Sequence, residues 1–313
     1  MNYVQLYQAI IDYSENTEPL FINNIPRFVM EAEDRVYNSV QIPSLRKNVI
    51  GTLTGSNKYL SCPNDYLSTY SLAVIDSTGS YTYLLNKDVN FIRECYPDQN
   101  STGLPKYYAL FGSQYTNPNE LTFIMGPTPD INYQAELHYF YYPVSIVQGA
   151  IAVFGVSPAT GFNGGTLYTN GVYSNVPLSG GNGSGATANI VVSGGSITSV
   201  ILTNPGNFYA QGDLLTVNST YIGGTGSGLV IPVTSVNNPA GTSWLGDNYD
   251  PVLFYGAMRE AILFMKGEQD MVQYYEKMYQ DAVQQLSRLG DGLERGDSYR
   301  DGQLKINVGG RGS

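Results

Sequence analysis

Few residues in this sequence have the types and spacing needed for acid–base or metal chemistry. His138 is the single histidine, and it lies in the aromatic stretch ELHYFYYP. A Ser-His-Asp triad needs a histidine that is oriented by a carboxylate and lies next to a hydroxyl, and this setting does not supply one. A zinc site based on histidine lacks further ligands here. We therefore interpret His138 as a strand residue with no catalytic role.

Clustered carboxylates are the next candidates for acid–base work. Glu31, Glu33 and Asp34 follow one another closely, with Arg27 and Arg35 on either side. Acids and bases at helical spacing are typical of the polar side of an amphipathic helix. The pattern predicts a solvated or interface face and not a catalytic pair.

Two glycine-rich stretches, GGNGSG at 180–185 and GGTGSG at 223–228, look superficially like nucleotide-binding loops. A Walker loop needs a lysine directly after its glycines, and no Lys or Arg occurs between Lys106 and Arg259. A dinucleotide-binding turn needs a following helix, whereas strand-like residues follow both stretches. The sequence therefore predicts no catalytic residue, no cofactor and no metal, and the protein is expected not to be an enzyme.

Composition narrows the class of protein further. The 313 residues carry a formal net charge of −10, which disfavours sequence-specific binding to DNA. No secretory signal and no apolar run long enough to span a bilayer are recognisable, so no membrane partner is expected. Cys62 and Cys95 are not closely spaced, and we expect two reduced thiols.

Charge divides the chain into three parts. Residues 149–243 contain no Lys or Arg and one acid, Asp213, and they hold 19 of the 35 glycines. The segments on both sides are rich in charged residues. This abrupt change in composition predicts a module that is inserted into a host domain.

The host segments change their hydrophobic period along the chain. Apolar residues at helical spacing predict one helix over Tyr3–Tyr13 and a second from Asn24, as its cap, to Pro43. From Leu45 to residue 147 the period becomes two and predicts strands, with a hairpin turn at DSTGS (76–80) and a short helix at DVNFIREC. In the aromatic strand Tyr139–Tyr142, alternation can bury only half of the rings, which leaves the others for a subunit interface.

The last segment is predicted to be helical again. Asp250 is the expected cap of one helix, Gly267 interrupts it, and a longer helix is expected to stop at Gly290. The polar residues that follow have little apolar surface to bury and need a partner to become ordered.

Together these patterns predict an α+β fold. We expect N-terminal helices (1–43) and C-terminal helices (244–296) to form one helical bundle around a small central β domain (44–148), with an inserted all-β module (149–243) and an extended C-terminal arm (297–313).

Several blocks of the host segments, in the same order, resemble the head-to-tail adaptor family of tailed bacteriophages, whose members are also called connectors or tail tubular protein A. The likeness covers about residues 1–147 and 243–303 and lies in IPRFVMEAEDRVYNSVQIPSLRKN, VIDSTGSYTYLLNKDVNFIRECYPD, LTFIMGPTPD, YQAELHYFYYP and WLGDNYDPVLFYGAMREAILFMKGE. It is not a catalytic motif.

The resemblance implies a virion protein of the neck or tail, made in the bacterial cytoplasm. It implies a homo-oligomeric ring, usually of twelve copies, that joins the portal to the tail nozzle and continues the channel for genomic DNA. The C-terminal arm would then bind the portal through Asp297, Tyr299, Arg300, Asp301, Leu304 and Ile306. Acidic residues such as Glu260 and Asp270 are candidates for a repulsive channel wall along which DNA slides.

The inserted module departs from this family pattern and repeats itself. Residues 180–193 match residues 223–235 at an offset of 43, and each copy is a glycine-rich turn followed by an alternating apolar run. We expect two similar β units that pack face to face and bury Ala188, Ile190 and Val192 from the first copy, and Val230 and Val233 from the second.

Two functions remain open for the module. Its uncharged surface suits contact with another virion protein. In the alternative, the chain is a binding protein whose module recognises host glycan or anchors a tail fibre, and the helices only mount it.

Overall fold

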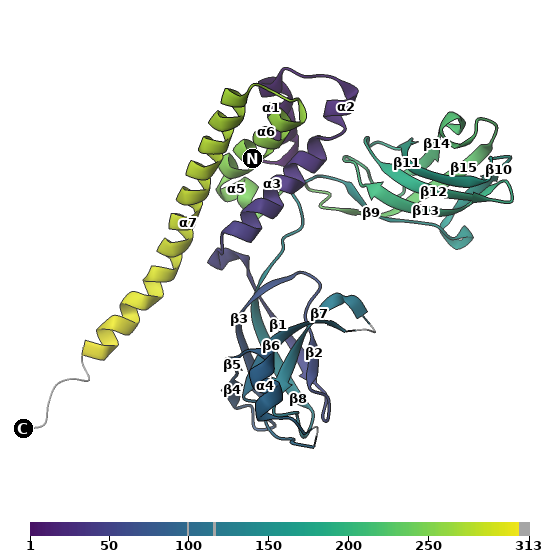
Figure 1. Cartoon of the computed structure of the whole chain (residues 1–313). Coiled ribbons are helices and arrows are strands. Elements are labelled where there is room, and N and C mark those ends of the chain that lie inside the picture. The colour runs from purple at the N-terminus through teal and green to yellow at the C-terminus, as the bar shows by residue number, and fades with distance from the viewer. Residues whose placement is uncertain (99, 115–116, 307–313) are drawn as a thin grey trace, which may run out of the picture. The chain divides into compact units, whose positions relative to one another are not determined.

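The computed structural model describes residues 1–98, 100–114 and 117–306, except for the side chains of residues 114–120 and 291–306. This part of the chain divides into two compact units. The first contains residues 1–40 and 144–289, and the second contains residues 41–143 and the chain from Gly290 onward. Figure 1 shows the elements of both units.

Helices from distant parts of the chain pack together in the first unit (Figure 1). The packing is close at Gly256, where an added β-carbon would lie 2.9 Å from the Cβ of Ala32 and 3.3 Å from the ring of Tyr279. The absence of a side chain at Gly256 lets its helix accept Ala32 and the Tyr279 ring, which belong to two other helices, at this distance. The helices of this unit are α1 (Tyr3–Ser14), α2 (Pro19–Ile22), α3 (Ile25–Ser39), α5 (Trp244–Asn248), α6 (Asp250–Phe264) and α7 (Gln269–Ile306), which continues past the unit.

The helix ends differ from the sequence predictions in three places. Asn24 occupies the cap position of α3, but its amide donates to the carbonyl oxygen of Leu20 and not to the helix end. Asp250 is the first residue of α6, and Tyr249 precedes it as the cap residue. Helix α7 continues through Gly290 to Ile306, because one glycine costs a helix only about 1 kcal/mol. Residues 297–306 are therefore helical where an extended arm was expected.

The second unit contains two four-stranded sheets with strand orders β1-β8-β3-β4 and β2-β7-β6-β5. Alternate residues from both sheets, such as Leu72, Val74, Phe123 and Leu137, bury a shared core. The strands are β1 (Arg46–Leu53), β2 (Tyr59–Ser61), β3 (Tyr66–Ile75), β4 (Tyr81–Tyr83), β5 (Leu85–Asn86), β6 (Tyr107–Gln114), β7 (Asn117–Gly126) and β8 (Tyr133–Tyr141).

Local predictions for this unit are confirmed. The Oδ1 atom of Asp76 accepts hydrogen bonds from the backbone N–H groups of Thr78 and Ser80, and this fixes the turn between β3 and β4. The DVNFIREC stretch forms α4 (Val89–Cys95), which Asp88 caps.

The inserted residues form one seven-stranded sheet in the first unit. Six strands follow the order β10-β15-β14-β11-β12-β13, and β9 pairs with β15. The end strands β10 and β13 contact each other, so the sheet curls around its own core (Figure 1). The strands are β9 (Ala150–Phe154), β10 (Asn163–Thr166), β11 (Gly171–Ser179), β12 (Thr187–Ser193), β13 (Ser196–Asn204), β14 (Leu214–Val217) and β15 (Ser227–Asn237).

These findings correct the predicted architecture. A helical bundle with a small β domain is wrong, because the described part of the chain is β-rich, with 36% of residues in strands, 32% in helices, and three sheets. The arrangement of the module as two face-to-face units is also wrong. Strand β11 pairs with both β12 and β14, so strands that contain both repeats join one sheet. Burial confirms Ala188, Ile190, Val192 and Val233, but Leu229 and Ile231 are buried in place of Val230.

The sequence repeat corresponds to a structural repeat in which each glycine-rich loop packs against a tyrosine from the other half of the module. In the first copy, Gly183 lies under the ring of Tyr209, and an added β-carbon would be 2.4 Å from the Cγ atom. In the second copy, Gly226 lies under Tyr168, at 1.9 Å from Cδ1. Both tyrosines are buried, so a side chain at either glycine would displace a core ring.

Hydrogen bonds also connect each glycine-rich loop to the tyrosine of the other half. The backbone N–H of Leu229, three residues after Gly226, donates to the Tyr168 hydroxyl at 3.4 Å. Tyr209 makes the corresponding contact with the backbone of Ala186, three residues after Gly183. Each glycine-rich loop is therefore completed by a ring from the other half of the module.

Candidate interaction sites

Among the residues that the structure describes, the candidate acid–base residues lie in separate places and form no cluster of metal ligands. No group of three or more His, Cys, Asp or Glu residues there could hold a metal ion. His138 Nε2 lies 3.3 Å from the Oε1 atom of Glu136, which also accepts a hydrogen bond from Asn48 Nδ2 at 2.5 Å. The bond from Asn48, together with His138, lowers the pKa of Glu136. This is a polar cluster on the outer face of the sheet β1-β8-β3-β4.

The aromatic strand β8 is buried more completely than alternation predicts. Tyr139 lies in the core, and the neighbouring Phe140 on the outer face is also buried. The guanidinium of Arg46 covers Phe140, with its Cζ atom 4.9 Å from the ring centre. The exposed rings of this face are Tyr70 from β3 and the stacked pair Tyr81 and Tyr83 from β4.

Glu33 contradicts the interpretation of the acidic cluster as a solvated face. Its side chain is 2% exposed, whereas Glu31 lies at the surface and pairs with Arg27 at 2.7 Å. The Glu33 carboxylate accepts hydrogen bonds from Ser145 Oγ and, at 2.9 Å, from the backbone N–H of Ile146. Burial nevertheless raises the pKa of Glu33 to about 7. The sequence could not reveal this, because the partner segment lies 112 residues away.

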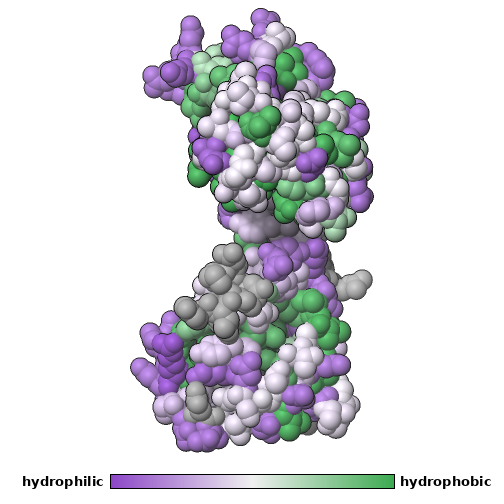
Figure 2. Space-filling view, turned by 90° about the vertical axis from the view of Figure 1, so that its right-hand side faces the viewer, coloured by the Kyte–Doolittle hydropathy of each residue, from purple (hydrophilic) through white to green (hydrophobic). Residues whose placement is uncertain are grey.

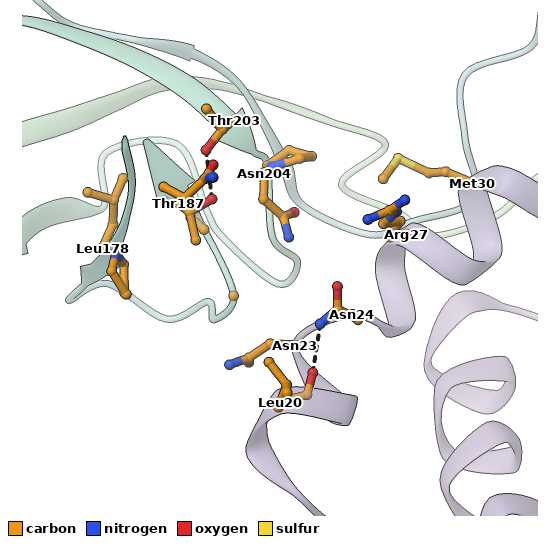
Figure 3. A pocket seen from close by; sticks show the side chains of 14 residues that line it. Leu20, Asn23, Asn24, Arg27, Met30, Leu178, Thr187, Thr203 and Asn204 are labelled. Carbon is orange, nitrogen blue, oxygen red and sulfur yellow. Dashed lines mark hydrogen bonds between the residues drawn. The ribbon is translucent and has the colours of Figure 1, made fainter. Parts of the chain in front are cut away.

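An open groove of about 600 Å³ lies between the helices and the module within the first unit (Figure 3). Arg27 is its one charged residue, and the view shows side chains from α2 and α3 facing those from the module. The lining combines amides and hydroxyls with apolar groups: Leu20, Asn23, Asn24, Arg27, Met30, Asn175, Pro177, Leu178, Gly185, Ala186, Thr187, Thr203, Asn204 and Pro205.

The single acid of the module is used internally. The Oδ2 atom of Asp213 accepts from the backbone N–H groups of Asn182 at 3.0 Å and Ala210 at 2.9 Å, and Oδ1 accepts from Asn182 Nδ2. The module therefore presents a surface of amide, hydroxyl and scattered apolar groups. Figure 2 shows this face with many residues of intermediate hydropathy and separate hydrophobic ones.

The two candidate channel acids lie in different environments. Glu260 on α6 is 12% exposed and is held between the guanidinium groups of Arg35 at 2.6 Å and Arg259 at 2.7 Å. Asp270 lies in the exposed first turn of α7. The side chains of Asp297, Tyr299, Arg300, Asp301, Leu304 and Ile306, the predicted portal contacts, lie outside those that the structure describes.

Two further predictions concern thiols and membranes. Cys62 is buried, Cys95 is exposed, and both are free. None of the helices in the described part of the chain is long and apolar enough to cross a bilayer.

Three polar residues at the junction between the helices and the module, Tyr3, Asn207 and Asn238, were not found from the sequence. Tyr3 on α1 is fully buried, and its hydroxyl accepts a hydrogen bond from Asn207 Nδ2 at 3.0 Å. Asn238 binds both ends of the insert. The sequence contains a signal for Tyr3 only, which lies on an apolar helix face. It contains none for the two asparagines, because a sequence does not show which distant segment an asparagine contacts.

Comparison with known proteins identifies the N-terminal half of the chain. No curated protein matches the sequence. The family model of the SU10 adaptor protein matches residues 1–163, which covers α1 to α4, both sheets of the second unit and the first strand of the insert. The match covers more than half of the sequence, and the chain therefore belongs to the SU10 adaptor protein family, whose members are phage adaptor proteins and components of the virion.

Proposed function

We propose that this phage adaptor protein is a head-to-tail connector. Twelve copies form a ring that binds the portal on one side and the tail nozzle on the other, and genomic DNA passes through the ring without sequence-specific binding. Membership of the adaptor family is the observation that carries the proposal. The role is structural and needs no catalytic site.

Exposed apolar residues on the helices support assembly into a ring. A ring of identical subunits needs two different complementary patches on each copy. One candidate patch contains Tyr13 of α1 and Tyr274 of α7, which are 66% and 54% exposed. The other contains Leu20 of α2 and Phe264 of α6, which are also exposed. Aromatic residues of this kind are enriched in the energetic centres of interfaces.

Assembly of the purified full-length chain tests this proposal directly. Mass photometry and electron microscopy should find rings, and the double substitution Tyr13→Ala, Tyr274→Ala should shift the particles toward monomers. Tyr221→Ala, at a similarly exposed position in the module, serves as the matched control. A chain that stays monomeric both alone and in the presence of portal would contradict the connector role.

The acidic character of the chain suits a DNA channel, because like charge keeps DNA from adhering to the wall. Asp270 is the better of the two candidate channel acids, since Glu260 is already neutralised by two arginines. If Asp270 lines the channel, Asp270→Asn in an infectious particle should slow genome ejection, and an unchanged rate would remove this residue from the channel wall.

A second candidate function concerns the module. Its uncharged surface and the amide-lined groove favour a role in binding host glycan or a tail fibre protein. A glycan array probed with the full-length chain separates this alternative from a purely structural role. Binding that is lost in Arg27→Ala and Asn204→Ala would support recognition in the groove.

A further inference from the structure

The two ends of the insert meet at one asparagine. Asn238 Nδ2 donates to the carbonyl oxygens of Ser145 and Thr242, both at 2.8 Å. Its Oδ1 atom accepts from the backbone N–H of Gly241 at 3.0 Å and of Thr242 at 3.3 Å. Residue 145 lies where the chain enters the insert and residue 242 where it leaves. One side chain therefore uses its whole hydrogen-bonding capacity to join the two crossings.

The segment by which the chain enters the insert is also bound to the helices. Ser145 Oγ donates to the buried carboxylate of Glu33 on α3, and it accepts from the backbone N–H of Val147 at 3.2 Å. The adjacent Ile146 donates its N–H to the same carboxylate and is fully buried, as is Val147. Water has little access to the contact between Glu33 and Ile146, so breaking it leaves a buried partner unsatisfied.

A third set of contacts binds the helices to the body of the module. The backbone N–H of Tyr3 donates to the carbonyl oxygen of Gly241 at 2.8 Å, and its hydroxyl accepts from Asn207. The rings of Tyr3 and Tyr7 lie 5.4 Å and 5.3 Å from the ring of Phe208. The turn between β13 and β14 is thereby packed on α1.

We propose that Glu33, which is buried, and Asn238, which is half-buried, form a polar latch that, together with the packing of Tyr3 and Tyr7 on Phe208, holds both ends of the insert on the helices, so that the module and the helices move as one rigid body. A module tethered only by two chain crossings would be free to swing. With the latch closed, any partner bound by the module is held in a fixed direction relative to the helices. This inference does not depend on the ring or on the identity of the partner.

Hydrogen exchange on the full-length chain tests the latch. We expect peptides that cover residues 145–149 and 238–242 to be protected, and Glu33→Ala or Asn238→Ala to speed their exchange about tenfold or more. Peptides from β12 and β13, in the middle of the module, should keep their wild-type rates. Glu33→Gln retains an acceptor for Ile146 and a donor for Ser145, and it should restore most of the protection.

Controls separate the latch from a general loss of stability. Glu31→Ala removes a partly exposed carboxylate from the same helix, and Asn23→Ala removes an exposed amide, so both should leave exchange unchanged. Acceleration that is equal over all peptides would show only a less stable unit and would overturn the proposal. Unchanged exchange in both latch variants would overturn it as well.

Distance measurements provide an independent test. Spin labels at Val4→Cys on α1 and Val172→Cys on β11, both at exposed positions, report the separation of the helices and the module in a Cys95→Ser background. We expect one narrow distance distribution in the parent chain and a broader one when Asn238→Ala is added. A broad distribution in the parent chain would show that the module swings freely and would refute the latch.

Discussion

The guanidinium Nη2 atom of Arg35 lies 2.6 Å from the Oε1 atom of Glu260, and this ion pair joins α3 to α6 across 225 residues of chain. Arg259 binds the same carboxylate oxygen and also pairs with Glu276 of α7. The network thus connects α3, α6 and α7, and any assembly through the first unit depends on these helices. It makes Glu260 a structural residue.

We predict that Glu260→Gln destabilises the subunit. The substitution leaves two arginines facing a neutral amide in a place that is largely shielded from water, and the loss should be about 1–3 kcal/mol. Urea unfolding of the full-length chain measures it. Asp270→Asn, at an exposed position on α7, is the control and should change the free energy of unfolding by less than about 0.5 kcal/mol. Equal stability of Glu260→Gln and the parent would mean that the network contributes nothing.

Glu33 should make stability depend on pH in a direction unusual for a carboxyl group. Its pKa is about 7 in the folded chain, against 4.5 as the ordinary value, because burial disfavours the charged form and Asp34 adds repulsion. Between pH 4.5 and 7, the folded state therefore holds a proton on Glu33 that the unfolded state has already lost. The contribution of Glu33 to stability is therefore fully present below about pH 4.5 and is lost as the pH rises through 7.

The pH dependence can be isolated with Glu33→Gln, which cannot titrate. The free energy of unfolding of the parent, relative to this variant, should fall by about 3 kcal/mol between pH 4.5 and 8. Urea titrations of both proteins at several pH values measure the difference, and carboxylates elsewhere cancel because both proteins share them. Parallel stability curves would contradict the prediction.

Gly226 should be among the least replaceable residues of the module. A β-carbon at this position would lie 1.9 Å from the Tyr168 ring, so Gly226→Ala must displace a buried aromatic and should cost about 3 kcal/mol or more. Gly194→Ala is the matched control, because Gly194 has a φ of 65° but open space around it, and it should cost about 1 kcal/mol. Thermal unfolding followed by circular dichroism compares the two. Equal losses would show that the ring contact is unimportant.

Deletion of residues 298–313 tests the proposed portal contact. The buried core residues that the structure describes all lie before this segment, so the truncated chain should fold and keep the β-sheet signal of its circular dichroism spectrum. It should no longer bind purified portal in co-sedimentation. Retained binding would show that the portal contact lies elsewhere on the chain.

Local patterns in the sequence predicted local structure well, whereas long-range contacts could not be derived. Helical spacing placed α1 and α3, and the Asp76 turn and the Asp88 cap follow from side chains that bond to nearby backbone. Gly290 misled the prediction of the α7 end, because a glycine inside a long helix costs too little to stop it. Strands were predicted within residues 149–243, where β9 to β15 lie, but their topology was predicted wrongly, since strand order depends on which distant strand β11 pairs with on each side.

The candidate sites also divide into local contacts that the sequence predicts and long-range contacts that it does not. The pairing of Arg27 with Glu31 follows from their spacing of four residues on one helix. The burial of Glu33 does not, because it depends on Ser145 and Ile146 being brought onto α3 by the fold. The sequence predicted that the three neighbouring acids share one solvated or interface face, and the structure separates them by their position around the helix.

The exchanged tyrosines of the module also have an evolutionary implication. A chain with only one glycine-rich half would have a loop without the tyrosine that packs on it, and a tyrosine without its loop. Two such chains could pair about a twofold axis, each supplying the tyrosine that the other lacks. The insert thus consists of two halves, neither of which completes its own glycine-rich loop. A phage lineage would be expected to acquire or discard such an insert whole, since either half left behind would lack the ring that completes its core.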